Sequence, residues 1–260
     1  MHNLKSFITL SLVVLFLLTG LTQADILMKQ KMHTDGFQVM GQAQPAKDET
    51  NTIWITSDKL RSDNPEQSII MRLDQNKMYI LDNAKKTYTE MPMEMGKAMS
   101  DQIDKAMNEK GMNEQQKNNI MSMMQGMSQM KLTITPTDET KKIGNWNCRK
   151  YEQKLQTAMG ASEGEIWATE DLKVDPELYS QYMTAIMGKG GMFGNAMEEM
   201  SKEMKKIKGV PVLTITTTNM MGASVKSTQE LLEFKEGTAP SGYFDIPTGY
   251  KKIEGMNFQH

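Results

Sequence analysis

The chain has 260 residues, 38% of them hydrophobic, with 30 basic and 32 acidic side chains that give a formal net charge of −2. This near balance, with no Lys/Arg run longer than two residues, excludes the charge pattern of a nucleic-acid-binding protein or of a protein held on an anionic membrane surface. The length suits one large domain with a buried core.

Residues 1–24 have the features of a secretory signal peptide. Lys5 precedes an apolar core over residues 7–18, and small residues lead to a predicted cleavage site after Ala24. The apolar core is too short to span a bilayer, and no later stretch reaches the roughly 20 apolar residues that a transmembrane helix needs. We therefore expect a periplasmic protein of residues 25–260, with no stable transmembrane segment after signal removal.

Strands are predicted where apolar and polar residues alternate in runs rich in β-branched and aromatic side chains. In the first third of the chain these runs are 26–33, 52–61, 68–74, 77–82 and 86–90. Polar turns at 74–77 and 82–85 separate neighbouring runs, which favours antiparallel hairpins.

A methionine-rich segment follows at about 91–130, with eleven of the chain's 27 methionines. Met99, Ile103 and Met107 recur every fourth residue, and Met124 and Met127 continue such a stripe beyond a break at 110–111. Methionine is flexible and polarisable, so a surface built from it can adapt to apolar partners of different shape. This segment is predicted to be an amphipathic helical hairpin.

The middle of the chain returns to alternating runs at 131–136, 145–156 and 164–170. Cys148, the only cysteine, lies in one of them, so no intrachain disulfide can form. Its place in an alternating strand favours a buried structural thiol over an intermolecular disulfide or a metal ligand.

A second helical segment is predicted at about 175–208. Asp175 and Pro176 suit an N-cap and the first helical position. Two apolar stripes, separated by a glycine-rich break at 188–191, contain Leu178, Tyr182 and Ile186, then Met197, Met200, Met204 and Ile207. Strands are predicted again at 212–219, 224–234 and 249–254.

Several of these runs carry a family resemblance. The motifs are IMRLD at 70–74 leading into KMYIL at 77–81, KTYTE at 86–90, IGNWNCRKYE at 143–152 and GYFDIPTGYKK at 242–252. They resemble an uncharacterised family of exported bacterial proteins known only as a domain of unknown function, similar in pattern to the outer-membrane lipoprotein carrier. The resemblance covers most of the mature chain.

This resemblance implies an α+β fold: a curved antiparallel sheet forming a half-open barrel that cradles acyl chains. The two inserted helical hairpins would cover its concave face. None of the matching motifs contains a catalytic residue. His33 and His260 are the only histidines after residue 24, and no glycine-rich phosphate loop is present. We therefore expect a non-catalytic binding protein that needs no cofactor.

Three hypotheses compete for the apolar side chains. In the first, an apolar small molecule or lipid is enclosed by Trp54, Met71, Met78, Ile80, Met99, Ile103, Met124, Trp146, Trp167, Tyr182, Ile186, Met197, Met200 and Met204. In the second, copper(I), a soft ion suited to thioether ligands, is bound by Met91, Met93, Met95, Met121, Met123 and Met124. In the third, the methionine-rich faces dock on another envelope protein.

Overall fold

The computed structural model describes residues 25–39, 41–93, 115, 118, 130–157, 160–175, 178, 182, 194–220 and 222–254. Within these residues the chain forms one 12-stranded sheet and a separate two-stranded hairpin. The first half contains β1 (Asp25–Thr34), β2 (Phe37–Val39), β3 (Gln42–Gln44), β4 (Lys47–Ile55), β5 (Lys59–Asp63), β6 (Gln67–Arg72), the 3-10 turn η1 (Leu73–Gln75), β7 (Lys77–Asp82) and β8 (Thr87–Pro92). The second half contains β9 (Lys131–Ile143), β10 (Trp146–Thr157), β11 (Gly160–Thr169), α4 (Gly194–Met204), β12 (Val210–Met220), β13 (Ala223–Gly237) and β14 (Lys251–Lys252).

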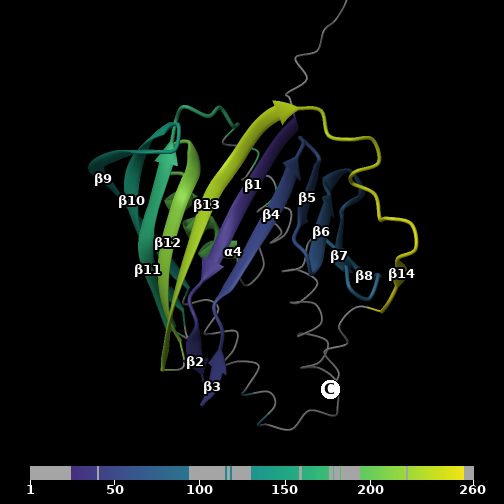
Figure 1. Cartoon of the computed structure of the whole chain (residues 1–260), viewed down its shortest axis with the longest axis horizontal. Helices are drawn as coiled ribbons and strands as arrows, with labels where there is room; N and C mark the ends of the chain where they lie inside the picture. The colour runs from purple at the N-terminus through teal and green to yellow at the C-terminus, as the bar shows by residue number, and fades with distance from the viewer. Residues whose placement is uncertain are drawn as a thin grey trace, which may run out of the picture.

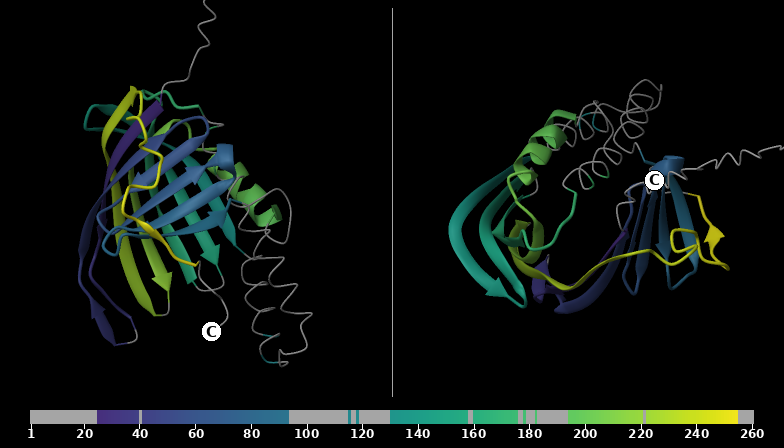
Figure 2. Two further views of the ribbon diagram at one scale, coloured as in Figure 1. Left: turned by 90° about the vertical axis from the view of Figure 1, so that its right-hand side faces the viewer. Right: turned by 90° about the horizontal axis from the view of Figure 1, so that it is seen from above.

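The large sheet consists of two antiparallel meanders joined by one antiparallel pairing, and the short strand β14 is added in parallel beside β8 at one edge. Its order is β14-β8-β7-β6-β5-β4-β1-β13-β12-β11-β10-β9, and the first and last parts of the chain meet where β1 pairs with β13 (Figure 1). Seen from above, the sheet bends into an open U, with β9 to β12 in one arm and β4 to β8 in the other (Figure 2). The expected curved, half-open antiparallel sheet is confirmed, and it does not close into a barrel.

The predicted strand positions are largely confirmed, with two corrections. The predicted run 52–61 is two strands, because Thr56 Oγ1 accepts hydrogen bonds from the N–H groups of Asp58 and Lys59 and so forms a turn between β4 and β5. The β2–β3 hairpin and the first half of β4 are not predicted, since residues 42–51 are mainly polar and lack apolar alternation.

Of the two predicted helical hairpins, only part lies in the described residues. Helix α4 confirms the last helical stretch of the second segment, and Leu178 and Tyr182 are also helical. The hairpin at 91–130 lies almost entirely outside the described residues, as does most of 175–193. Within the described part of the chain the structure therefore supports one helix rather than two helical hairpins.

Helix α4 lies against β9, the last strand of one arm of the U (Figure 2). Ile134 N–H donates to Glu203 Oε2 at 2.7 Å, and Lys206 Nζ donates to the carbonyl oxygen of Ile134 at 3.4 Å. Lys206, and next the Ile134 N–H, hold the pKa of the Glu203 carboxyl below its ordinary value. Glu203 at the end of α4 and Lys206 just after it thus satisfy backbone groups of Ile134 on the edge strand β9 that would otherwise be open to another chain.

Candidate functional site

Strand register divides the side chains of the sheet between two faces. Residues directly opposite each other on paired strands share a face, and successive residues along a strand alternate. We call the inner face the one that carries Ile26 and Met28, because Leu178 and Tyr182 pack on it. The opposite side is the outer face.

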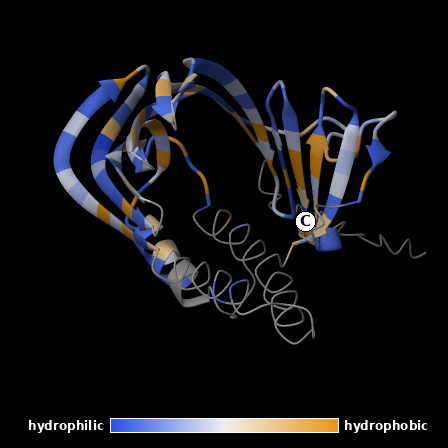
Figure 3. Cartoon of the chain, turned by 90° about the horizontal axis from the view of Figure 1, so that it is seen from below, coloured by the Kyte–Doolittle hydropathy of each residue, from blue (hydrophilic) through white to orange (hydrophobic). Residues whose placement is uncertain are grey.

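The inner face of β1 and β4 to β8 is a continuous apolar surface. Two adjacent cross-strand rows cover it. One consists of Ile26, Ile55, Leu60, Met71, Met78 and Met91, and the next consists of Met28, Ile53, Ser62, Ile69, Ile80 and Thr89. Ten of these twelve side chains are apolar, so we call the two rows the apolar floor; Figure 3 shows hydrophobic residues recurring along this arm.

Tyr182 and Leu178 contact one end of the apolar floor. Both are buried, with Ile26, Ile55, Leu60 and Met71 in the same cluster. Tyr182 Oη donates a hydrogen bond of 2.9 Å to the carbonyl oxygen of Thr56, in the turn between β4 and β5. Burial raises the pKa of the Tyr182 phenol well above its ordinary value. The second helical segment is therefore anchored on the inner face at this point.

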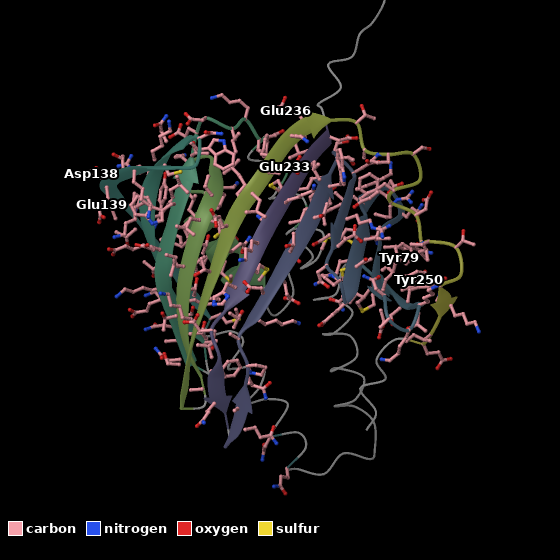
Figure 4. The ribbon with its side chains drawn as sticks, viewed as in Figure 1. Tyr79, Asp138, Glu139, Glu233, Glu236 and Tyr250 are labelled. Carbon is pink, nitrogen blue, oxygen red and sulfur yellow. The ribbon has the colours of Figure 1, made fainter. Side chains whose placement is uncertain are left out.

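A cavity of about 510 Å³ adjoins the same end of the floor. It lies beside Ile26, and Leu172 and Val174, from the segment that follows β11, also line it. The remaining lining is polar and mainly acidic: Glu170, Lys173, Asp175, Gly209 and Glu236. Figure 4 shows Glu236 with Glu233 near the end of β13. The cavity thus joins an apolar surface to an acidic rim.

Further along β1 and β4, and across β10 to β13, the inner face is polar rather than apolar. Here the side chains are mostly uncharged but polar, and we call this surface the polar zone: Gln30, Asn51, Gln153, Ser162, Thr214, Thr216, Thr218, Ser227 and Gln229. At the far end of the same face, Ile134, Tyr151 and Ile166 form a second apolar cluster, covered by Ile207 just after α4. The inner face is therefore apolar at both ends and polar between them.

The outer face of β5 to β8 is covered by the chain's own C-terminal segment. Ile70 and Leu81, both 0% exposed, pack with Tyr79 against Phe244, Ile246 and Tyr250. Tyr79 and Tyr250 lie together in Figure 4. Tyr243 Oη donates to Asp63 Oδ2 at 2.6 Å, and Arg61 Nη1 donates to the Tyr243 carbonyl oxygen at 2.8 Å. This face is structural core.

The predicted ligand-binding residues separate into three groups. Met71, Met78 and Ile80 lie together on the apolar floor, and Tyr182 packs at its end. Trp54 is on the outer face, 6.2 Å from the Tyr243 ring, while Trp146 and Trp167 belong to a separate cluster with Cys148. The structure does not bring these three tryptophans together with the methionines.

The predicted helical residues are placed only in part. Met200 and Met204 are half-buried on α4, and Met197 lies on the same helix. Met99, Ile103, Met124 and Ile186 lie outside the described residues. Residues that sequence reasoning missed include Ile26, Met28, Ile53, Leu60 and Ile69. Their alternation in the predicted strands could have indicated one apolar face, but only the register shows that they share it.

The described residues offer few candidates for a metal ligand or a nucleophile. Of the predicted copper ligands, Met91 and Met93 are described and Met95, Met121, Met123 and Met124 are not. No cluster of three or more His, Cys, Asp or Glu side chains suited to a metal occurs in the described ranges. His33 is hydrogen-bonded to the carboxylates of Asp48 and Asp35, each at 3.0 Å, on an exposed part of β1.

Cys148 is 2% exposed, as expected for a structural thiol. Burial, and next the carboxylate of Asp171, raise the pKa of the thiol above its ordinary value, which lowers its reactivity. Lys141 Nζ lies 3.7 Å from the centroid of the neighbouring Trp167 ring. The cysteine therefore belongs to the packed end of β10 and β11.

Solved structures that match over most of this chain's length include the following two. A DUF1329 family protein from Desulfovibrio piger ATCC 29098 is 7% identical over 86% of this chain and 90% of its own, with a TM-score of 0.30. A putative outer membrane lipoprotein-sorting protein domain from Vibrio parahaemolyticus is 6% identical over 85% of this chain and 89% of its own, with a TM-score of 0.30. One of these neighbours is thus named as a domain of unknown function and the other as a lipoprotein-sorting domain, the two kinds of protein that the strand motifs resemble.

No protein-family model matches the chain, and no curated protein matches it. Among the helical residues that the structure describes, none forms a helix long and apolar enough to cross a membrane.

Proposed function

We propose that the chain is an exported, non-catalytic binding protein that holds a lipid, an acyl chain or another apolar ligand on the inner face of its curved sheet. The apolar floor carries this proposal. Its two rows cross six adjacent strands, and five inter-strand steps of roughly 4.8 Å give a length of about 24 Å. Such a surface suits an extended alkyl chain.

The driving force would be the removal of apolar area from water, worth about 25 cal/mol per Å². The floor ends at the 510 Å³ cavity, whose apolar side, formed by Ile26, Leu172 and Val174, continues the same surface. Tyr182 shows how a helical segment can pack on the floor while its hydroxyl is satisfied by Thr56. We propose that the segments 91–130 and 175–208 cover the ligand in the same way.

Titration with the neutral apolar dye N-phenyl-1-naphthylamine tests this function. We expect saturable fluorescence enhancement in the wild-type protein. Ile53→Lys places a charge on the apolar floor and should weaken dye binding by at least about tenfold, because a buried unpaired charge is costly. Thr52→Lys, the next residue on β4, places the same charge on the outer face and should leave binding unchanged.

Circular dichroism would first establish that both variants are folded. Absence of saturable binding to the wild-type protein, or an equal loss of affinity in the two variants, would overturn the proposed function.

Copper(I) binding stays a prediction, and one observation favours keeping it. Met71, Met78 and Met91 are directly opposite one another on β6, β7 and β8, which gathers three thioethers in one row. A copper(I) titration under reducing conditions decides this alternative. Binding that persists unchanged in Met91→Leu/Met93→Leu would count against the predicted ligands. Docking of another envelope protein also stays a prediction, tested by co-purification from the native envelope.

A further inference from the structure

Around the polar zone, uncharged polar side chains and charged side chains lie mainly on opposite faces of the sheet. In the polar zone, which spans the middle of β1, β4 and β10 to β13, the inner face carries mainly amides and hydroxyls, whereas most charged residues alternate onto the outer face, among them Lys29, Lys31, Lys150, Glu163, Glu165 and Glu230. Lys29 and Glu233, for example, form an ion pair of 2.9 Å on the outer face. Solubility alone does not require the inner side chains to be uncharged.

Hydrogen bonds within the polar zone join these groups in pairs. Gln229 Nε2 donates to Gln30 Oε1 at 2.8 Å, and Gln153 Nε2 donates to Thr216 Oγ1 at 3.0 Å. An amide has two N–H donors and two acceptor sites, so one such bond leaves hydrogen-bonding capacity on each side chain. The zone can therefore bind further polar groups without losing its internal bonds.

Asn51 supplies the most specific feature. Its Nδ2 donates to Met32 Sδ at 3.1 Å, but its Oδ1 is buried and has no hydrogen-bond partner among the residues the structure describes. A buried acceptor without a donor is costly and calls for a partner. Asn51 precedes Ile53 of the apolar floor by two residues on the same face of β4, which corresponds to roughly 7 Å.

We propose that the inner face selects an amphiphile whose head group is uncharged and carries a hydroxyl or an amide N–H. The alkyl chain lies on the apolar floor, and the head group lies on the polar zone and donates a hydrogen bond to Asn51 Oδ1. This proposal rests on the proposed function and specifies its ligand class. A charged head group is disfavoured because the nearest charges on this face, Lys47 and Glu49, already pair with each other at 2.7 Å.

Displacement of N-phenyl-1-naphthylamine by three lipids with the same acyl chain tests this selection. The lipids are 1-monooleoylglycerol, which has hydroxyl donors, methyl oleate, which has none, and oleate, which is charged. We expect monooleoylglycerol to bind at least about tenfold more tightly than either of the others, the effect of one hydrogen bond to an otherwise unpaired acceptor. Equal affinity for all three would overturn the selection and leave apolar binding intact.

Two variants test whether Asn51 causes the preference for monooleoylglycerol. Asn51→Leu removes the acceptor and should reduce the preference for monooleoylglycerol over methyl oleate to within about twofold, without weakening methyl oleate. Thr50→Val, the adjacent exposed residue on the outer face, should keep the full preference. A preference that survives in Asn51→Leu would refute the role of Asn51. If none of the lipids displaces the dye, this proposal fails, whereas the proposed function fails only if the dye itself does not bind saturably.

Discussion

Gly164 tests the close approach of β11 and β12 that shapes the inner face. An ideal Cβ at this residue would lie 2.1 Å from Ile215 O and 2.9 Å from Thr216 Cα, whereas ordinary contact begins at 3.4 Å. Both neighbours are backbone, so Gly164→Ala forces the two strands to separate by roughly 1 Å at this point.

The expected loss of stability follows from that displacement. Two ladder hydrogen bonds at about 1 kcal/mol each, with an overpacking cost of about 1–3 kcal/mol, lower the free energy of unfolding by about 3–5 kcal/mol. For a domain of this size the Tm should fall by roughly 10 °C.

Thermal and urea unfolding followed by circular dichroism measure this effect. Gly237→Ala is the matched control, because a Cβ there has nothing within 4 Å, and it should change the free energy of unfolding by less than about 1 kcal/mol. A Gly164→Ala protein within about 1 kcal/mol of wild type would refute the strand geometry.

Three further outcomes are expected. Tyr182→Phe should lower the free energy of unfolding in urea by about 1 kcal/mol, because the hydrogen bond to Thr56 O is lost; an unchanged value would contradict that anchor. Glu203→Ala should speed amide hydrogen exchange of Ile134 by about fivefold or more, and equal protection would show that the carboxylate does not protect the edge. Two lysines hold the pKa of Glu90 at about 2 in the folded chain, below its ordinary 4.5. As the pH falls, the Glu90 carboxylate is therefore protonated in the unfolded chain before it is protonated in the folded chain. Stability should therefore fall as the pH drops from about 4.5 toward 2, with a weaker pH dependence in Glu90→Gln when urea midpoints are compared.

Most strands could be predicted because half-buried strands alternate in hydrophobicity. The runs around Met71, Met78 and Ile80 show this alternation clearly, and all three residues lie on the apolar floor. The turn at Thr56 was harder to predict, since the residues on both sides of it continue the pattern of a single strand. Its position depends on side-chain hydrogen bonds to Thr56 Oγ1.

Which face each strand presents could not be predicted from alternation alone. Trp54 has the size and hydrophobicity of a ligand-binding residue, yet its partners Arg61 and Tyr243 place it on the outer face. That position depends on the C-terminal segment, nearly 190 residues away along the chain. Asn51 was missed for a related reason: only the fold shows that its side-chain oxygen is buried without a partner.

Photo-crosslinking with a neutral alkyl diazirine is the most direct test of ligand binding on the inner face. The protein would be irradiated with the bound probe, digested, and analysed by mass spectrometry to locate the adducts. We predict adducts on the apolar floor, at Ile53, Met71 and Ile80, and their loss on addition of excess monooleoylglycerol. Adducts confined to the outer face or to α4, or labelling that monooleoylglycerol does not reduce, would contradict the account.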